Sequence, residues 1–390
     1  MPVVNRFADL APTIAEWRRD IHAHPEVLFD THRTSALVAG KLRDFGCDEV
    51  ATGIGRTGVV GVIRGRASAS GRVVGLRADM DALPIAEATG LPYASATPGA
   101  MHACGHDAHP AMLLGAAQYL AETRHFDGTA VVIFQPAEEG GGGGREMVED
   151  GMMERFGIQE VYGLHNMPGL AVGDFYIRPG ALLASSDLFT ITVTGRGGHA
   201  AQPHNTVDPV VAASAIVLAL QSIVARNVDP LHPAVVSVTS FRTGSETFNV
   251  IPERVELRGT VRTLETAVQD LIEERIGALI EATAAAYGAT ATLDYVRNYP
   301  VTANSARETD FAARVAAEVV GTPRVDADAA PVMGAEDFSF MLNARPGAFI
   351  FVGNGDTAKL HHPKYDFNDE LIPVGCSYWA RLVETAMPIA

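Results

Sequence analysis

The first half of the chain alternates amphipathic segments with short apolar runs. Apolar residues spaced three and four apart over 9–22 and 34–45 predict two helices. Short apolar runs predict buried strands at 58–64, 73–76, 129–134 and 160–164. A further helix is expected over 109–124, with Asp107 as its N-cap. Strands that alternate with helices predict an α/β fold with a mixed, mostly parallel sheet flanked by helices.

From about Ser186 the pattern changes. The expected order there is β-α-β-β-α-β, the ferredoxin-like arrangement, over 187–195, 207–226, 234–241, 254–263, 264–288 and 290–298. We therefore expect an inserted ferredoxin-like α+β domain at 185–299, within a discontinuous catalytic domain formed by 1–184 and 300–390. After the insertion, a helix, a strand and a closing helix are expected at 308–320, 348–352 and 374–387.

The composition argues against several classes of protein. A chain of 390 residues suits two domains, and 47% hydrophobic residues suffice for a large core. A net charge of −16 repels nucleic acid and anionic lipid, so neither is an expected partner. Three cysteines are too few for a disulfide framework and indicate a reducing, cytoplasmic location. We see neither a signal-peptide pattern nor a run of about 18 apolar residues, so no membrane span is expected.

Acidic residues and a histidine follow three of the predicted strands. Asp79 and Asp81 come after the strand at 73–76, Glu138 and Glu139 follow the strand at 129–134, and His165 directly follows the strand at 160–164. In open α/β sheets, sites form outside the carboxyl ends of the strands. We expect these side chains to lie close together.

The segment 101–109, MHACGHDAH, holds five potential metal ligands within eight residues: His102, Cys104, His106, Asp107 and His109. A single Cys and His would more often be a buried apolar residue and a helix cap. Burying all five without a cation would cost several kcal/mol. The cluster therefore predicts a metal site, and its thiol favours a transition metal.

The pair Glu138-Glu139 precedes a run of five glycines, 140–144. The run lacks the Gly-Lys-Ser/Thr ending of a phosphate loop, so phosphate binding is not expected. One carboxylate that binds metal and one that transfers protons fit metal-assisted hydrolysis better. Asp79 and Asp81 are candidates for orienting the ligands. The pair His361-His362, in a late loop, offers a further ligand.

Eight segments together resemble the signatures of the metal-dependent aminoacylase/carboxypeptidase superfamily. They are 24–26 (HPE), 77–84 (RADMDALP), 101–107 (MHACGHD), 135–140 (QPAEEG), 163–166 (GLHN), 195–201 (GRGGHAA), 248–252 (FNVIP) and 333–338 (MGAEDF). The chain is most similar to the branch that contains hippurate hydrolases and indole-acetyl-amino-acid hydrolases. The resemblance spans nearly the whole chain.

The resemblance implies a site with two divalent metal ions, which could be Mn, Zn, Ni or Co. The residues that fall on the ligand positions are Cys104, His106, Glu139, His165 and His361. Glu138 falls on the general acid/base position, and Asp81 falls where a carboxylate orients the metal centre. His361 is preferred to His362 because the family pattern places the ligand directly after a Leu and two residues before a Pro.

The resemblance also implies that the inserted domain dimerises, giving a homodimer or a higher homo-oligomer. His199 would then reach a neighbouring active site and stabilise the oxyanion, and Asn249 matches a substrate-contacting position. From the residues alone, His199 and Asn249 could equally be exposed turn residues.

We therefore expect a metal-dependent amidohydrolase whose substrates are N-acyl amino acids, such as hippurate-like, N-acetyl or aryl-acetyl conjugates. A dipeptidase or carboxypeptidase with the same dimetal chemistry is the first alternative. A catalytically silent metal-binding or ligand-binding protein is the second, and a thiol hydrolase that uses Cys104 as its nucleophile is the third. The sequence does not distinguish the acyl group, because a fold does not determine the substrate.

Overall fold

The computed structural model describes residues 4–389, which form two compact units. The first unit comprises the described residues up to Leu182, Thr302–Ala330 and the residues from Asp337 onward. The second unit comprises Leu183–Val301 and Pro331–Glu336. The insertion expected at 185–299 falls within the second unit. The short segment Pro331–Glu336, which we had assigned to the catalytic domain, packs with the second unit as well.

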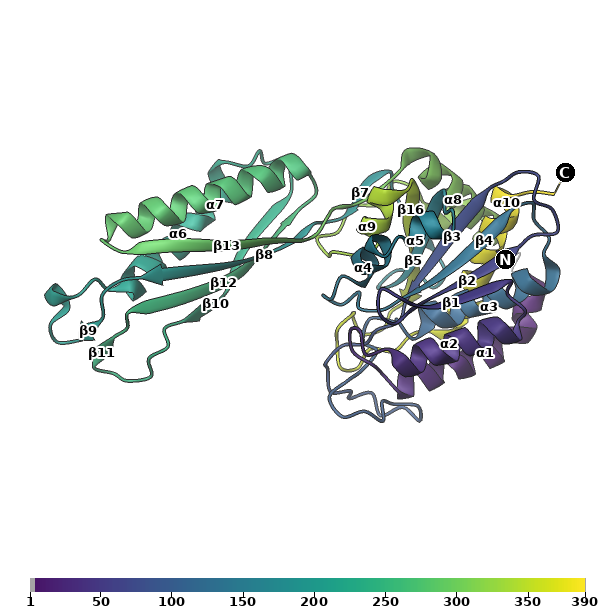
Figure 1. Cartoon of the computed structure of the whole chain (residues 1–390), viewed down its shortest axis with the longest axis horizontal. Helices are drawn as coiled ribbons and strands as arrows, with labels where there is room; N and C mark the ends of the chain where they lie inside the picture. Colours follow the sequence, from purple (N-terminus) through teal and green to yellow (C-terminus); the bar gives the residue numbers. More distant parts are fainter. Residues whose placement is uncertain (1–3, 390) are drawn as a thin grey trace. The chain divides into compact units, whose positions relative to one another are not determined.

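The first unit is built on an eight-stranded sheet (Figure 1) with the order β1-β2-β4-β3-β5-β16-β6-β15. Its strands are β1 (Glu49–Ile54), β2 (Gly58–Arg64), β3 (Val73–Asp79), β4 (Thr129–Gln135), β5 (Glu160–Pro168), β6 (Phe175–Tyr176), β15 (Val325–Asp326) and β16 (Gly347–Gly355). The neighbours β4, β3, β5 and β16 are parallel, whereas β1–β2, β2–β4 and β6–β16 are antiparallel. The prediction of a mixed, mostly parallel sheet is therefore confirmed.

Helices and short strands complete this unit. They are α1 (Asn5–Ala23), α2 (His32–Asp44), α3 (Ala108–Thr123), α4 (Gly143–Glu149), α5 (Met152–Arg155), β7 (Gly180–Leu183), β14 (Thr302–Asn304), α8 (Ala306–Val320), η2 (Thr322–Arg324), α9 (Ser339–Ala344), η3 (Asp369–Leu371) and α10 (Ile372–Ala386). The helix α10 packs against α1, α3 and α8, and α4 packs against α9.

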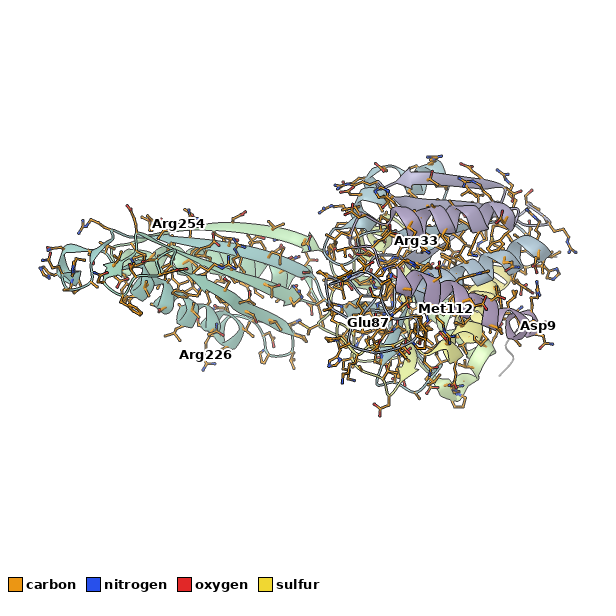
Figure 2. The ribbon with its side chains drawn as sticks, turned by 90° about the horizontal axis from the view of Figure 1, so that it is seen from below. Asp9, Arg33, Glu87, Met112, Arg226 and Arg254 are labelled. Carbon is orange, nitrogen blue, oxygen red and sulfur yellow. The ribbon has the colours of Figure 1, made fainter. Side chains whose placement is uncertain are left out.

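The helix α3 is buried on nearly every side. Its apolar sequence suits this position, because it packs against β3, α1 and α10 and so has no face directed only to solvent. Met112, labelled in Figure 2, lies in this helix and is fully buried. The burial fixes the N-terminal end of α3, where the predicted metal-binding segment 101–109 joins it.

The second unit has the order β8 (Ser186–Thr194), β9 (Gly198–His199), η1 (Pro203–Asn205), α6 (Pro209–Arg226), β10 (Ala234–Arg242), β11 (Val250–Ile251), β12 (Arg254–Thr263), α7 (Thr266–Ala286) and β13 (Thr290–Tyr299). Its main sheet has the order β10-β12-β8-β13, with antiparallel neighbours throughout. The helices α6 and α7 pack against each other and against this sheet (Figure 1). This is the ferredoxin-like arrangement that the sequence predicts.

Among the described residues, α6 alone is long and apolar enough to cross a membrane, with a mean hydropathy of 1.7 over its 18 residues. This differs from our expectation that the chain contains no such stretch. Its buried residues, which include Ile216 and Leu220, belong to the hydrophobic core of the second unit. The helix ends at Arg226, which Figure 2 labels. Core helices of globular domains commonly have this composition, so the finding is weak support for a membrane span.

Some local predictions differ from the structure. The strand β5 continues to Pro168, so His165 lies within the strand rather than after it. The strand β1 was missed because its residues are largely exposed and form no apolar run. Asp107 makes no capping hydrogen bond at the start of α3. Its carboxylate instead accepts a hydrogen bond from His22 Nδ1 at 2.8 Å.

The pairing of β16 with β5 requires a glycine at position 347. A Cβ at Gly347 would lie 2.0 Å from the backbone oxygen of Val161 on β5, so Gly347→Ala has to push the two strands apart. We expect this variant to lower the free energy of unfolding by about 1–3 kcal/mol. The matched control is Gly40→Ala in α2, where a Cβ meets nothing within 4 Å and better helix propensity should stabilise the protein by up to about 1 kcal/mol. Urea unfolding of both variants measures the difference, and equal effects would contradict the argument.

Candidate metal centre

Four parallel strands deliver the chemical groups of the site to one edge of the sheet. Asp79 ends β3, Glu138 and Glu139 follow β4, His165 lies near the end of β5, and His361 lies in the loop after β16. Because parallel neighbours run in the same direction, their carboxyl ends meet at the same edge. The sequence predicts all four strands, but it links only the first three to the site, and the structure adds β16.

The structure brings the predicted metal ligands together. Five sets of potential ligand atoms among the described residues each lie within 4.8 Å of one another, and three of these sets join the predicted ligands: Cys104, His106 and His165; Cys104, Glu139 and His361; and His106, Glu138 and Glu139. The Sγ atom of Cys104 is 3.5 Å from Nε2 of His165, and Nε2 of His361 is 3.4 Å from Oε1 of Glu139. We call Cys104, His106, Glu139, His165 and His361 the ligand group.

Backbone oxygens orient two histidines of the ligand group. Nδ1 of His106 donates to the carbonyl oxygen of Asp81 at 3.0 Å, and Nδ1 of His165 donates to the carbonyl oxygen of Asn166 at 2.6 Å. Each Nε2 is thereby left with its lone pair for a ligand, as in metal-binding histidines.

Two atoms of the ligand group lack hydrogen-bond partners among residues 4–389. They are Nε2 of His106 and Oε1 of Glu139, and both are buried. Buried polar atoms without partners are costly, so their presence here calls for a ligand. A divalent cation would satisfy both, and a set of imidazole, carboxylate and thiol donors suits a transition metal. The residues of this site therefore fit two divalent metal ions.

The titration behaviour of the ligand group agrees with this interpretation. Burial, followed by the charge of Glu139, raises the pKa of the Cys104 thiol to about 12, so the thiolate needs a bound cation to form at neutral pH. Burial also tends to raise the pKa of Glu139, but the nearby imidazole of His361 and the charge of His106 outweigh it, and the pKa is lowered. Glu139 is therefore ionised and available as a ligand.

Asp81 holds the acidic pair through the backbone. Its carboxylate accepts hydrogen bonds from the N–H groups of Glu138 at 2.8 Å and Glu139 at 3.1 Å. The preceding residue, Ala137, has a φ of 55°, which is unusual for a residue with a side chain. This conformation turns the chain after β4, and the N–H groups of the pair then reach Asp81. Asp81 thus orients the acidic pair.

The glycine run after the acidic pair serves close packing of the backbone. A Cβ at Gly143 would lie 1.7 Å from the carbonyl oxygen of Pro136, so only glycine fits there. Gly140 and Gly142 have φ values of 100° and 70°, which glycine adopts without strain. The run returns the chain from β4 to α4 in a tight turn.

The five potential ligands of the segment 101–109 have different surroundings. Only Cys104 and His106 belong to the ligand group. His109 lies 2.6 Å from Asp79, and Asp107 pairs with His22 on α1. Both ring nitrogens of His102 are buried without a hydrogen-bond partner among the described residues, and burial lowers the pKa of this imidazole to about 3. The density of the cluster predicts a metal site, but it does not reveal which members face it.

The loop after β16 presents His361 rather than His362 to the ligand group. The backbone N–H of His361 donates to the carbonyl oxygen of Ala103 at 2.7 Å, and the residue adopts a φ of 63°. His362 is exposed, and its Nδ1 accepts a hydrogen bond from the backbone N–H of Lys364 at 3.1 Å.

His199 and Asn249 belong to the second unit. His199, in β9, pairs with Val250 in β11, and the N–H of Ala200 donates to the carbonyl oxygen of Asn249 at 3.0 Å. Both side chains are exposed. The two predicted residues are therefore neighbours at the surface of this unit.

Several residues that support the site escaped the sequence analysis. Arg18 and His22, on α1, are fully buried and contact Asp107. Asn166 and Tyr365 lie behind the ligand group and are joined by a hydrogen bond of 2.6 Å. Asn166 directly follows His165 and Tyr365 follows His361 by four residues, but no spacing rule distinguishes them from ordinary polar or core residues.

The chain is similar to known enzymes over nearly its whole length. The model of the family described as peptidase family M20/M25/M40 matches residues 75–385. Hippurate hydrolase of Campylobacter jejuni is 43% identical over 382 residues, which cover 98% of each protein. N-acetylcysteine deacetylase of Bacillus subtilis is 39% identical over 366 residues, which cover 94% of each. The crystal structure of the Bacillus subtilis YXEP protein, a dinuclear metal binding peptidase from the M20 family, matches with a TM-score of 0.84 and 34% identity, covering 97% of this chain and 99% of that one.

The two neighbouring histidines of the late loop provide a matched test of the ligand group. We expect the His361→Ala variant to bind one cation fewer, because the set of ligands formed by Cys104, Glu139 and His361 then lacks its imidazole. His362→Ala should keep both cations, because this imidazole lies outside the ligand group. Metal content after dialysis, measured by plasma mass spectrometry, distinguishes them. Full occupancy in His361→Ala, or a loss in His362→Ala, would contradict the assignment.

Proposed function

The chain belongs to peptidase family M20/M25/M40, and from this premise we propose that it is a metal-dependent amidohydrolase that releases amino acids from N-acyl amino acids. The observation that carries the proposal is the ligand group assembled beside a second carboxylate, Glu138, at the carboxyl edge of the sheet. Two relatives act, by their names, on hippurate and on N-acetylcysteine, which are both N-acylated amino acids. The substrate is therefore a small amino-acid conjugate.

In this proposal the ligand group holds two divalent cations through Cys104, His106, Glu139, His165 and His361. When bound, such cations supply Lewis acidity and make water more acidic. The mixed nitrogen, oxygen and sulfur donors accept Mn, Zn, Ni or Co. Asp81 keeps the acidic pair oriented through its two hydrogen bonds to the backbone.

Glu138 is the proton carrier of the proposed reaction. Its carboxylate takes a proton from the attacking water while the water oxygen bonds to the amide carbon. The same carboxyl group then returns the proton to the amide nitrogen as the carbon–nitrogen bond breaks. The products are a carboxylic acid and a free amino acid. Its neighbour Glu139 stays ionised as a ligand, so the two acids divide the tasks.

We assign the remaining roles to the second unit. His199 stabilises the oxyanion of the tetrahedral intermediate in the site of a partner subunit, an effect commonly worth a few kcal/mol, and Asn249 contacts the substrate. A homodimer through this unit is supported by exposed apolar residues on α6. Val211 and Leu218, seven residues apart on one face of the helix, are 50% and 74% exposed.

We place the enzyme in the cytoplasm. Its three cysteines, Cys47, Cys104 and Cys376, are all free thiols, as expected in a reducing compartment. The Cys104 thiol, as a proposed metal ligand, would also be lost on oxidation to a disulfide.

The first test is a substrate panel of hippurate, N-acetyl-methionine, indole-acetyl-alanine and a plain dipeptide. The metal-free protein should be inactive, and Mn, Zn, Co or Ni should restore release of the amino acid. The Glu138→Gln variant should bind both cations and lose at least about a hundredfold in kcat, because the general base and acid is removed. Cleavage of the dipeptide alone would favour a peptidase, and activity that survives chelation would favour a thiol hydrolase.

Mixing two inactive variants tests the role of the partner subunit. Glu138→Gln and His199→Ala should each be inactive as homodimers, but a mixed dimer contains one site with both residues intact. Mixing the two variants and allowing their subunits to exchange should therefore restore activity. The control is Glu138→Gln mixed with His361→Ala, where both changes fall on groups proposed to come from the same subunit and every site contains one defect. Restoration in the control, or none in the test, would refute the shared site.

A further inference from the structure

A chain of buried hydrogen bonds runs behind the ligand group and joins three segments that carry its members. Nη1 of Arg77 donates to Asp79 Oδ2 at 2.7 Å, and Nδ1 of His109 donates to Asp79 Oδ1 at 2.6 Å. Nε2 of His109 accepts a hydrogen bond from the backbone N–H of Asn166 at 3.3 Å and lies 2.7 Å from Oδ1 of the same residue, whose Nδ2 donates to the hydroxyl of Tyr365 at 2.6 Å. We call these five residues the support chain. All are buried.

Three members of the support chain lie next to ligands in the sequence. His109 follows His106 by three residues on the first turn of α3, Asn166 directly follows His165 in β5, and Tyr365 follows His361 by four residues. The hydrogen bonds between them therefore connect the loop before α3, the end of β5 and the loop after β16 without using any ligand atom.

The support chain packs against the turn between two members of the ligand group at Gly105. This residue separates Cys104 from His106 and has a φ of 95°. A Cβ at Gly105 would lie 2.1 Å from Oδ1 of Asn166 and 2.8 Å from the hydroxyl oxygen of Tyr365. The turn that carries two ligands is thus packed directly against the bonded pair of Asn166 and Tyr365.

Tyr365 is also the buried anchor of an exposed loop. The side chain of His361 is 53% exposed, and His362 and Lys364 are exposed as well, whereas Tyr365 is fully buried. The backbone N–H of Tyr365 donates to the carbonyl oxygen of His362 at 2.8 Å, which closes the loop into a turn. The position of His361 therefore depends on how Tyr365 is held.

We propose that Tyr365, acting through Asn166, is a positioning residue that holds the Cys104–His106 turn and His361 in the geometry that binds the cation shared by Cys104, Glu139 and His361. The inference rests on the ligand group of the proposed function and assigns a role to residues outside that group. Hydrogen bonds that orient ligands commonly change metal affinity by about 10- to 100-fold. Ordering the ligands before binding reduces the entropy that is lost on binding.

The chain offers a matched control. Tyr378, in α10, is also fully buried, but its hydroxyl has no hydrogen-bond partner among the described residues. Tyr365→Phe and Tyr378→Phe therefore remove the same atom from two buried tyrosines. Only the first change leaves the Asn166 amide without its acceptor.

The experiment measures the two cation affinities of the metal-free protein for Co and Zn by calorimetry and by competition with a chelator. The absorption spectrum of the cobalt protein reports thiolate ligation by Cys104. We expect Tyr365→Phe to lower the affinity for the more weakly bound cation at least about tenfold and to alter the cobalt spectrum. Tyr378→Phe should leave both the affinities and the spectrum unchanged. Unfolding of the metal-free variants is measured in parallel, because a purely structural role would lower stability without changing affinity.

A second variant tests whether the effect passes through Asn166. In an Asn166→Leu background, Tyr365→Phe should have little further effect on affinity, because the link is already broken. Additive losses, or unchanged affinities and spectrum in Tyr365→Phe, would overturn the inference and leave the proposed function intact. A wild-type protein that binds fewer than two cations would overturn the ligand group, and this inference with it.

Discussion

The parallel alignment of β4, β3, β5 and β16 is the constraint on which the rest of the first unit depends. These strands are buried on both faces, so their middles are continuous apolar runs and polar side chains are confined to their ends. Parallel strands also require crossover connections, which supply the covering helices. Because all four carboxyl ends lie at one edge, any polar groups placed there are forced together. The metal centre is a consequence of this geometry.

Charges gathered at a buried edge need partners, and the structure supplies them from outside the ligand group. Asp79 is paired with Arg77 at 2.7 Å, and Asp107 contacts the fully buried Arg18 on α1. An isolated buried carboxylate would cost several kcal/mol, and these arginines offset that cost with or without a cation. Nε2 of His106 still has no hydrogen-bond partner among residues 4–389. The buried atoms that have no internal hydrogen-bond partner are therefore the ones available to bind a cation.

Much of the fold could be predicted because burial leaves a direct pattern in the sequence. The buried strands β2 and β4 are uniform apolar runs, and the half-buried β12 alternates between buried and more exposed residues. The bounds of each strand were therefore predicted with little error. The edge strand β1 escaped because its exposed residues follow no apolar pattern. The candidate site was predictable to a similar degree. Acids and histidines at strand ends indicate metal chemistry, whereas the supporting Asn166 and Tyr365 look like ordinary residues until long-range contacts join them.

The sequence by itself determined the order of the elements, the two-unit plan and the kind of chemistry, because residue type and local spacing suffice for these. The choice of Cys104, His106 and His361 among their neighbours rested on the family resemblance, and only the tertiary structure shows that these side chains lie within 4.8 Å of further potential ligands. The physical reason is that the direction of a side chain depends on the local turn and on distant partners. The left-handed backbone at Gly105 and His361 sets those directions, and contacts with Asn166 and Tyr365 hold the turn at Gly105 in place.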